Sequence, residues 1–275
     1  LLGVPMGEAK VEVDKDLAIN PGQVFGELAG VATKDPTFGL DAKWISPNDR
    51  DKAQALGYTV VDVATVVATH VSQIIQDYAY ELLGHEQVQA LLNRLKETAP
   101  KLVEDVVPDK LPLVTLVKVL QSLLQDGVAI RDLRTILEAL AAHAGKTQDI
   151  QTLLMHVRNA LGRMIVQDLV GLDADLPVMT LEPSLEQLLI KSAQQSGDGV
   201  LGIEPGLAQK IHQSLETLVN EQEMKGEAAI LVVAPQIRQS LARLLHSSLS
   251  GLAVLAYSEI PETRSIRVVG TVGQS

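Results

Sequence analysis

Two features that the sequence lacks exclude whole classes of protein. The 275 residues include no cysteine, so neither a disulfide framework nor a thiolate metal site can form. The longest uninterrupted apolar run covers only residues 228–234, far short of the roughly 20 residues that cross a bilayer. No basic segment followed by an apolar run opens the chain, so a secretory signal is not expected. We expect a soluble, cytoplasmic chain.

Positive charge is also in short supply. The chain has 23 Lys and Arg against 34 Asp and Glu, which makes the formal net charge −11 and the pI about 5.0. Nucleic-acid binding draws on clustered Lys and Arg, so this balance argues against a nucleic-acid partner. The charge favours a protein partner, although a negative net charge also serves solubility alone.

Aromatic residues are the third scarcity. The chain has two Phe, one Trp and four Tyr, and six of these seven precede residue 81. The stretch KDPTFGLDAKWI at residues 34–45 holds Phe38 and the single Trp, Trp44. The composition therefore changes near residue 81, which indicates a change of structure there.

The first part of the chain has the patterns of a sheet followed by a helix. Residues 8–22, EAKVEVDKDLAINPG, alternate charged and apolar residues before a Pro-Gly turn, as half-buried strands do. A short helical pattern follows Pro47, and residues 58–62 resemble another strand. A helix that packs on the sheet is expected next, before Gly84. Its apolar stripe comprises Val63, Val66, Val67, Val71, Ile74, Ile75, Tyr78 and Leu82.

Residues 86–171 are rich in Leu and helical in period, which predicts a bundle of four or so helices. In IRDLRTILEALAAH, Arg134 and Glu138 are spaced to pair at i,i+4 beside an apolar face. The expected breaks are at Pro100, Pro108, Pro112, Gly127 and Gly145.

The last hundred residues alternate strand and helix patterns, which predicts a compact α/β unit. The strand patterns are LPVMTLE, AAILVVA, LAVLAY and SIRVVGTV, and the helix patterns begin at Ser184, Pro205 and Gln236. The whole chain is thus predicted to be a mixed α+β protein of several subdomains.

Motifs that would carry chemistry are weak or absent. GDGVLG at residues 197–202 matches a dinucleotide fingerprint, but it follows a helical pattern instead of a strand, which favours an inter-helix loop. The six histidines form no metal-ligand spacing; His143 and His246 fall near predicted helix ends, where a structural role is expected. No G-x-S-x-G or Walker loop is present. We expect neither an enzyme nor a bound cofactor or metal; the alternative is an enzyme whose acidic residues and histidines converge in space.

The aromatic stretch divides at a turn. Asp35 followed by Pro36 is a β-turn signature, because the Asp side chain accepts backbone N–H groups and Pro presets φ. Trp44 alternates with polar neighbours on a predicted strand, so it should point into the core. Phe38 lies at the end of the turn. It either fills a small local core or stands at the surface as an aromatic anchor for a partner.

Seven blocks taken in order resemble the cytoplasmic domain of the FlhA family, the export-gate proteins of flagellar type III secretion. They are LAINPG, DPTFGLDAKWI, GYTVVDVATVVATH, PKLVEDVVP, VLQSLLQDGVAIRDLRTILEALAAHA, NALGRMIVQDL and IEPGLAQKI, and they run over almost the whole chain. The most specific block is VAIRDLRTILEALA. The export gates of virulence injectisomes share the architecture, but DPTFGL and VVATH are more similar to the flagellar branch.

The resemblance implies four subdomains and a division of this chain among them. The predicted bounds are residues 1–13 and 63–82 for an incomplete split α/β subdomain, 14–62 for an inserted β-rich subdomain, 83–162 for a helical subdomain and 163–275 for a C-terminal α/β subdomain. By this division, residues 1–13 hold the last strand of the split subdomain and residues 63–82 hold a helix of it, and an N-terminal part of the subdomain is expected to be absent.

The resemblance also implies a docking platform without an active site. Family members are held in the inner membrane by an N-terminal region missing here, and their cytoplasmic domains assemble into a nonameric ring. The implied partners are flagellar export chaperones with bound substrates, the export ATPase complex and the switch protein of the gate. The implied location is the cytoplasmic face of the bacterial inner membrane.

In the family, chaperones bind a hydrophobic dimple lined by the Asp and Phe of a D-P-x-F-G turn and the Thr of a V-V-A-T-H helix. The matching residues here are Asp35, Phe38 and Thr69. A rival expectation makes Phe38 part of the core and the domain a ring scaffold without direct docking there.

Overall fold

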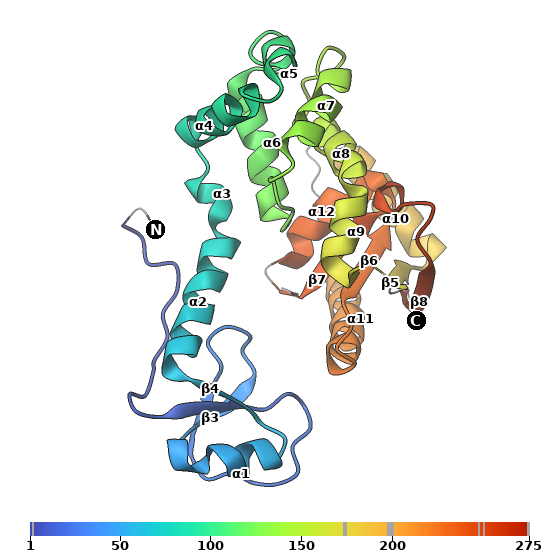
Figure 1. Cartoon of the computed structure of the whole chain (residues 1–275). Coiled ribbons are helices and arrows are strands. Elements are labelled where there is room, and N and C mark those ends of the chain that lie inside the picture. Colours follow the sequence, from blue (N-terminus) through green and yellow to red (C-terminus); the bar gives the residue numbers. More distant parts are fainter. Residues whose placement is uncertain (2, 173–174, 197–200, 247, 250, 274–275) are drawn as a thin grey trace. The chain divides into compact units, whose positions relative to one another are not determined.

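The computed structural model describes every residue except 2, 173–174, 197–200, 247, 250 and 274–275. The chain separates into two compact units, Leu1–Leu82 and Leu83–Ser275 (Figure 1). The boundary falls where the composition changes, just after the aromatic-rich part of the sequence. Each unit has helices packed on a sheet, which confirms the predicted mixed fold class. The finer division into four subdomains stays a prediction.

The first unit is built on a four-stranded antiparallel sheet with the order β2-β3-β1-β4. Residues alternate between its faces, so each face has its own apolar cluster. One cluster holds Leu17, Ala42 and Trp44, and the other holds Ala18, Ile45 and Val60 with Ala53 of helix α1. The strands are β1 (Asp16–Ile19), β2 (Val31–Lys34), β3 (Asp41–Ile45) and β4 (Thr59–Asp62), and η1 (Pro47–Asp49) leads into α1 (Arg50–Ala55).

The start of the chain departs from the sequence-based expectation. A strand was expected within residues 1–13, but the described residues of this segment form none, and the first strand begins at Asp16. A period-two pattern stabilises a strand only where a neighbour supplies backbone and side-chain pairs. Both sides of β1 are already paired, with β3 and β4, and the preceding residues join no edge of this sheet.

The helix that follows the sheet is shorter and less covered than its apolar stripe suggests. Helix α2 (Val63–Asp77) ends at Asp77, with Tyr78 as its C-cap, and a separate short helix, α3 (Ala79–Leu82), follows. Val66 is buried against the sheet, as expected. The later stripe positions Val67, Val71, Ile75 and Leu82 are exposed. The prediction that α2 packs on the sheet is therefore confirmed for its first turns. It is wrong for the rest of the helix, where these later stripe residues are exposed.

The second unit begins with six helices where about four were expected. Pro100 opens one of them and Pro112 precedes another, as the pattern predicted, and Arg134 pairs with Glu138 at 3.1 Å. An unforeseen break separates α8 from α9 at Leu161. The six are α4 (His85–Lys96), α5 (Pro100–Val106), α6 (Leu113–Gln125), α7 (Leu133–His143), α8 (Ile150–Ala160) and α9 (Gly162–Val170).

A four-stranded parallel sheet of order β7-β6-β5-β8 completes the second unit. Strands β5, β6 and β7 have apolar residues in succession because both faces are covered, whereas the edge strand β8 is exposed over its first three residues. One face adjoins the six helices, and the other packs against α10, α11 and α12. The elements are β5 (Leu176–Leu181), α10 (Pro183–Ser196), α11 (Pro205–Met224), β6 (Ala229–Val233), α12 (Pro235–His246), β7 (Leu252–Ala256), η2 (Tyr257–Glu259) and β8 (Ile266–Val272).

A charge network with both Arg side chains and Glu259 buried joins α8, α12, the end of α6 and the turn η2. Arg158 of α8 donates to both carboxylate oxygens of Glu259, at 2.9 and 2.7 Å, and to Asp126 at 3.1 Å. Arg238 of α12 donates to the same Asp126 oxygen at 2.6 and 2.8 Å. Two positive and two negative charges thus balance where water is excluded, as burial of charge requires.

Gly162 lets α9 approach this network closely. A Cβ atom at this position would lie 2.1 Å from the carbonyl oxygen of Glu259, a distance at which the backbone would have to move. The absence of a side chain therefore permits the contact between α9 and the turn η2 that carries Glu259.

Candidate functional site

The turn between β2 and β3 is closed by its own hydrogen bonds. Asp35 Oδ2 accepts from the backbone N–H of Phe38 at 2.7 Å and of Thr37 at 3.2 Å. Its backbone N–H donates to Leu40, and its carbonyl accepts from Gly39, which takes a left-handed φ of 69°. Pro36 further restricts the backbone. The sequence-predicted turn is thus present, and Asp35 holds it together from inside.

The turn carries Phe38 outward. The ring is 67% exposed, whereas Asp35 is 5% exposed and Trp44, on the following strand, is 4% exposed. Trp44 therefore belongs to the core, as its alternation predicted. Of the two interpretations of Phe38, local core or surface aromatic, the structure supports the second. An apolar ring on a closed turn is available for contact without rearrangement of the backbone.

Thr69 is placed by the packing of α2. It is exposed and lies three residues after Val66, so both side chains are on the same side of the helix. Val66 packs on the sheet face that contains Ala42. Ala42 is the second residue of β3, the strand that follows the turn. Hydrogen bonds join Asp35 to Phe38, whereas among the described residues no hydrogen bond or ion pair joins Thr69 to either of them.

A charged cap fixes the start of the helix that carries Thr69. Asp62 Oδ1 accepts from the backbone N–H of Thr65 at 2.7 Å, an N-cap bond that satisfies one of the free donors of the first turn. This N–H bond lowers the pKa of the Asp62 carboxyl from its ordinary value. The cap therefore stays ionised at neutral pH and favours the helix through its dipole.

Sequence reasoning did not foresee a second exposed aromatic, Phe25, which is 82% exposed. Its backbone N–H donates to Leu56, just before β4. The first residue of β4 pairs with Ile19, which in turn pairs with Ala42 next to the turn. Phe25 and Phe38 thus lie toward the same end of the sheet, together with the exposed Leu40. The scarcity of aromatics was the signal that could have marked Phe25.

These side chains offer apolar contact instead of acid–base or metal chemistry. Within the parts of the chain that the structure describes, three or more His, Asp or Glu side chains nowhere gather as a metal site would require. The GDGVLG pattern lies largely outside the described residues, which resume at Leu201. His143 and His246 are the last residues of α7 and α12, the helix-end positions that the sequence predicted.

A family model described as FHIPEP matches residues 1–265. The chain belongs to the FHIPEP family. Among its relatives is the flagellar biosynthesis protein FlhA of Proteus mirabilis, 44% identical over 271 residues that cover 98% of this chain and 38% of the relative. This FHIPEP chain thus spans less than half the length of the curated relatives that it matches.

Solved structures share the fold of this FHIPEP chain. The Chlamydia pneumoniae CdsV protein superposes with a TM-score of 0.83 at 23% identity, over 99% of this chain and 79% of that one. The nonameric EPEC SctV-C gives a TM-score of 0.77 at 24% identity, over 96% and 79% of the two chains. Among the described residues, no helix combines the length and the apolar character that crossing a membrane demands.

Proposed function

We propose that this chain is a cytoplasmic docking platform of a flagellar type III protein export gate. It binds export chaperones with their bound substrates and assembles with further copies into a ring. The exposure of Phe38 on a closed turn is the observation that carries the docking part of this proposal. The flagellar part is supported by the relatives named flagellar biosynthesis protein FlhA, which are 43–44% identical over 98% of this chain.

The geometry of the turn explains why Phe38 suits an interface. A partner that covers the ring removes a large apolar side chain from water, and aromatic anchors of this kind carry about 2 kcal/mol or more of a binding free energy. The backbone of the turn is already ordered by the bonds to Asp35, so little conformational entropy is lost on docking. Asp35 acts as the support of the turn, Phe38 as the anchor, and Thr69 as a polar neighbour on α2.

Ring assembly and the remaining partners are further parts of the proposal. The solved SctV-C and EscV cytosolic domains that share this fold are nonameric, and a self-associated ring of this chain would follow that arrangement. A structure of Chlamydia pneumoniae CdsV in complex with CdsO supports contact with other components of an export apparatus. We extend this to the export ATPase complex and the switch protein of the gate, with membrane attachment through a region outside this sequence.

A second candidate is the equivalent domain of a virulence injectisome. The fold neighbours CdsV and SctV-C favour it, but their identity to this chain is 23–24%, against 44% for the flagellar relative. The higher identity supports the flagellar assignment.

Titration of the 275-residue chain with a purified flagellar chaperone–substrate complex tests the proposal. We expect Phe38→Ala to weaken binding by about 30-fold, because the loss of an aromatic anchor costs about 2 kcal/mol. Isothermal titration calorimetry measures the affinity, and circular dichroism at increasing temperature checks the fold. Val31→Ala is the matched control, since Val31 is an exposed apolar residue of the same sheet near the opposite end of β3.

Three results would contradict the assignment in different ways. Equal affinity of Phe38→Ala and the parent chain shows that docking does not use this ring. Unfolding of Phe38→Ala shows that the ring supports the fold. An equal loss in Val31→Ala shows that the partner contacts the sheet broadly and that Phe38 is not an anchor.

A further inference from the structure

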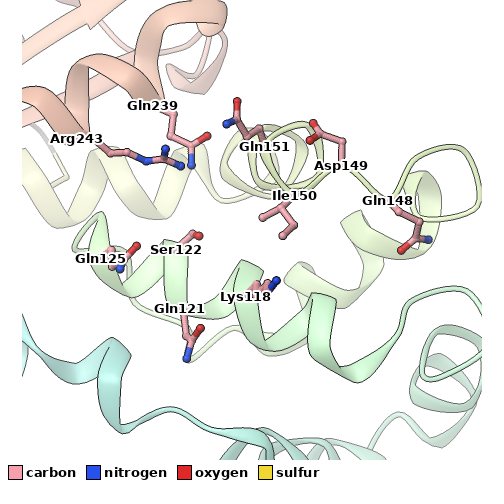
Figure 2. Close-up of a pocket in the computed structure, with 10 residues that line it drawn as sticks. All are labelled: Lys118, Gln121, Ser122, Gln125, Gln148, Asp149, Ile150, Gln151, Gln239 and Arg243. Atoms are coloured by element: carbon pink, nitrogen blue, oxygen red, sulfur yellow. The ribbon is translucent and has the colours of Figure 1, made fainter. Parts of the chain in front are cut away.

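The second unit contains an open cavity of about 480 Å³ between α6, the start of α8 and α12 (Figure 2). Its volume lies within the range of about 300–1,000 Å³ typical of ligand sites. Its lining is unusual because Ile150 is the single large apolar side chain among the residues around it. The polar members are Lys118, Gln121, Ser122, Gln125, Gln148, Asp149, Gln151, Gln239 and Arg243.

Two cations border the cavity from different helices. Lys118 and Ser122 lie on α6, and Arg243 and Gln239 lie on α12, across the opening in Figure 2. Lys118 and Arg243 are exposed, and no ion pair engages either of them in the part of the chain that the structure describes. By contrast, Arg238, on the same helix as Arg243, is bound to Asp126 inside the protein. Both cations are therefore free to receive a carboxylate.

Side-chain amides supply the rest of the polar surface. Gln148 Nε2 donates to the carbonyls of Lys110 and Ala144, and Gln121 Nε2 donates to the carbonyl of Leu83. These bonds fix two amides, and their Oε1 atoms are left as acceptors. An amide side chain offers the same donor and acceptor pair as a peptide group, so several amides around one cavity can pair with an extended polypeptide backbone.

Asp149 is the one carboxylate in the lining, and it is already used. Its Oδ2 accepts from the backbone N–H of Thr152 at 2.8 Å and from the Thr152 hydroxyl at 2.6 Å, as the N-cap of α8. The hydroxyl bond lowers the pKa of the Asp149 carboxyl, so this cap remains charged. An acidic ligand group is thus directed away from Asp149, toward Lys118 and Arg243.

We propose that this cavity binds an extended acidic segment of a partner protein, with its carboxylates at Lys118 and Arg243 and its backbone along the amides. A phosphate site would concentrate more cations than this lining provides, since it holds two, Lys118 and Arg243. The net charge of −11 repels acidic chains from the protein as a whole. An acidic segment therefore binds only where cations are gathered locally, as Lys118 and Arg243 are at this cavity. This site lies in the second unit and is separate from the Phe38 turn of the first.

Fluorescence anisotropy with a labelled octapeptide of alternating Asp and Ser, blocked at both ends, tests the site on the 275-residue chain. We expect binding that the neutral Asn-Ser octapeptide does not show. Lys118→Glu and Arg243→Glu should each weaken it about fivefold or more, because reversal removes an attraction and adds a repulsion. Lys210→Glu, the same charge change at an exposed position of α11 outside the lining, should leave it unchanged.

The competing outcomes are distinct. Inorganic phosphate that displaces the peptide at equimolar concentration would show a simple anion site and overturn the proposal. The proposal would also be overturned if the neutral Asn-Ser peptide bound as tightly as the Asp-Ser peptide, or if Lys210→Glu weakened binding as much as Lys118→Glu and Arg243→Glu. Phe38→Ala should bind the peptide like the parent chain, so a failed docking assignment and a failed cavity assignment are told apart. Thermal unfolding of each variant confirms that an exposed charge reversal leaves the fold intact.

Discussion

At the scale of single residues, Asp35 and Phe38 divide one turn between structure and contact. Asp35 is buried and satisfies two backbone donors, and Phe38 is exposed. The proposed docking role requires a residue of each kind, because an aromatic side chain on a loose turn would lose more conformational entropy on binding. Phe25 adds a second exposed ring toward the same end of the sheet.

Removal of the Asp35 carboxylate should loosen this turn without touching the ring. We expect Asp35→Ala to lower the free energy of unfolding of the first unit by about 1–2 kcal/mol, because two backbone N–H groups lose a charged acceptor. The fluorescence of Trp44, the single Trp and a core residue of this unit, reports urea unfolding there. Asp35→Asn retains one acceptor oxygen, so its free energy of unfolding should fall by less than that of Asp35→Ala. Equal stability of Asp35→Ala and the parent would show that the cap is dispensable.

At the scale of elements, helices α7 and α8 meet through two stacked histidines. The rings of His143 and His156 are parallel within 3° with centroids 3.5 Å apart. Burial, then the neighbouring His143 and Lys146, lower the pKa of His156 below its ordinary value of 6.5. Two protonated rings cannot remain in this contact without repulsion.

The burial of His156, together with its contact with His143, makes the second unit less stable in acid. Below pH 6.5 the unfolded chain takes up a proton at His156 that the folded chain refuses, so the free energy of unfolding falls as pH drops from 6.5 toward the lowered pKa. Above pH 6.5 this contribution is fully present. Urea unfolding followed by far-ultraviolet circular dichroism at pH 7.5 and 5.5 measures the difference.

Two histidine variants separate this effect from general acid sensitivity. His156→Gln should shrink the loss of stability between the two pH values, whereas His246→Gln, outside the stack, should not. An unchanged pH dependence in His156→Gln would refute the assignment to the stack.

At the scale of the whole molecule, the stability of the second unit depends on the network of Arg158, Glu259, Asp126 and Arg238. It ties residues that are 101 and 112 positions apart in the sequence. A buried ion pair contributes little compared with apolar packing, but the loss of one partner leaves an unbalanced buried charge. The network is therefore more sensitive to single changes than to paired ones.

Glu259→Gln tests this asymmetry. We expect it to lower the free energy of unfolding by about 3 kcal/mol or more, since Arg158 then shares Asp126 with Arg238. The double variant Arg158→Met with Glu259→Leu should lower the free energy of unfolding by less than Glu259→Gln alone. As a surface control, Arg134→Ala breaks the exposed pair with Glu138 and should cost about 0.5 kcal/mol. A double variant that is less stable than the single one would contradict this account.

The sequence by itself determined which segments form helices and strands over most of the chain. Turn chemistry at Asp35-Pro36 and the alternation around Trp44 act between close neighbours, so their outcome can be read locally. The mixed fold class followed from such patterns, whereas the family came from the resemblance of seven sequence blocks. The number of helices was not read from the sequence: the break at Leu161 lies beside Gly162, which approaches a turn far along the chain.

Only the tertiary structure decided whether Phe38 faces water and which side chains from separate elements meet each other. The sequence left two interpretations of Phe38 open, and its exposure depends on how the closed turn sits beyond the strands. The stacked histidines, the Arg158 network and the cavity at Lys118 and Arg243 join residues from separate elements. Convergence of this kind arises from packing in three dimensions, and no local period of the sequence records it.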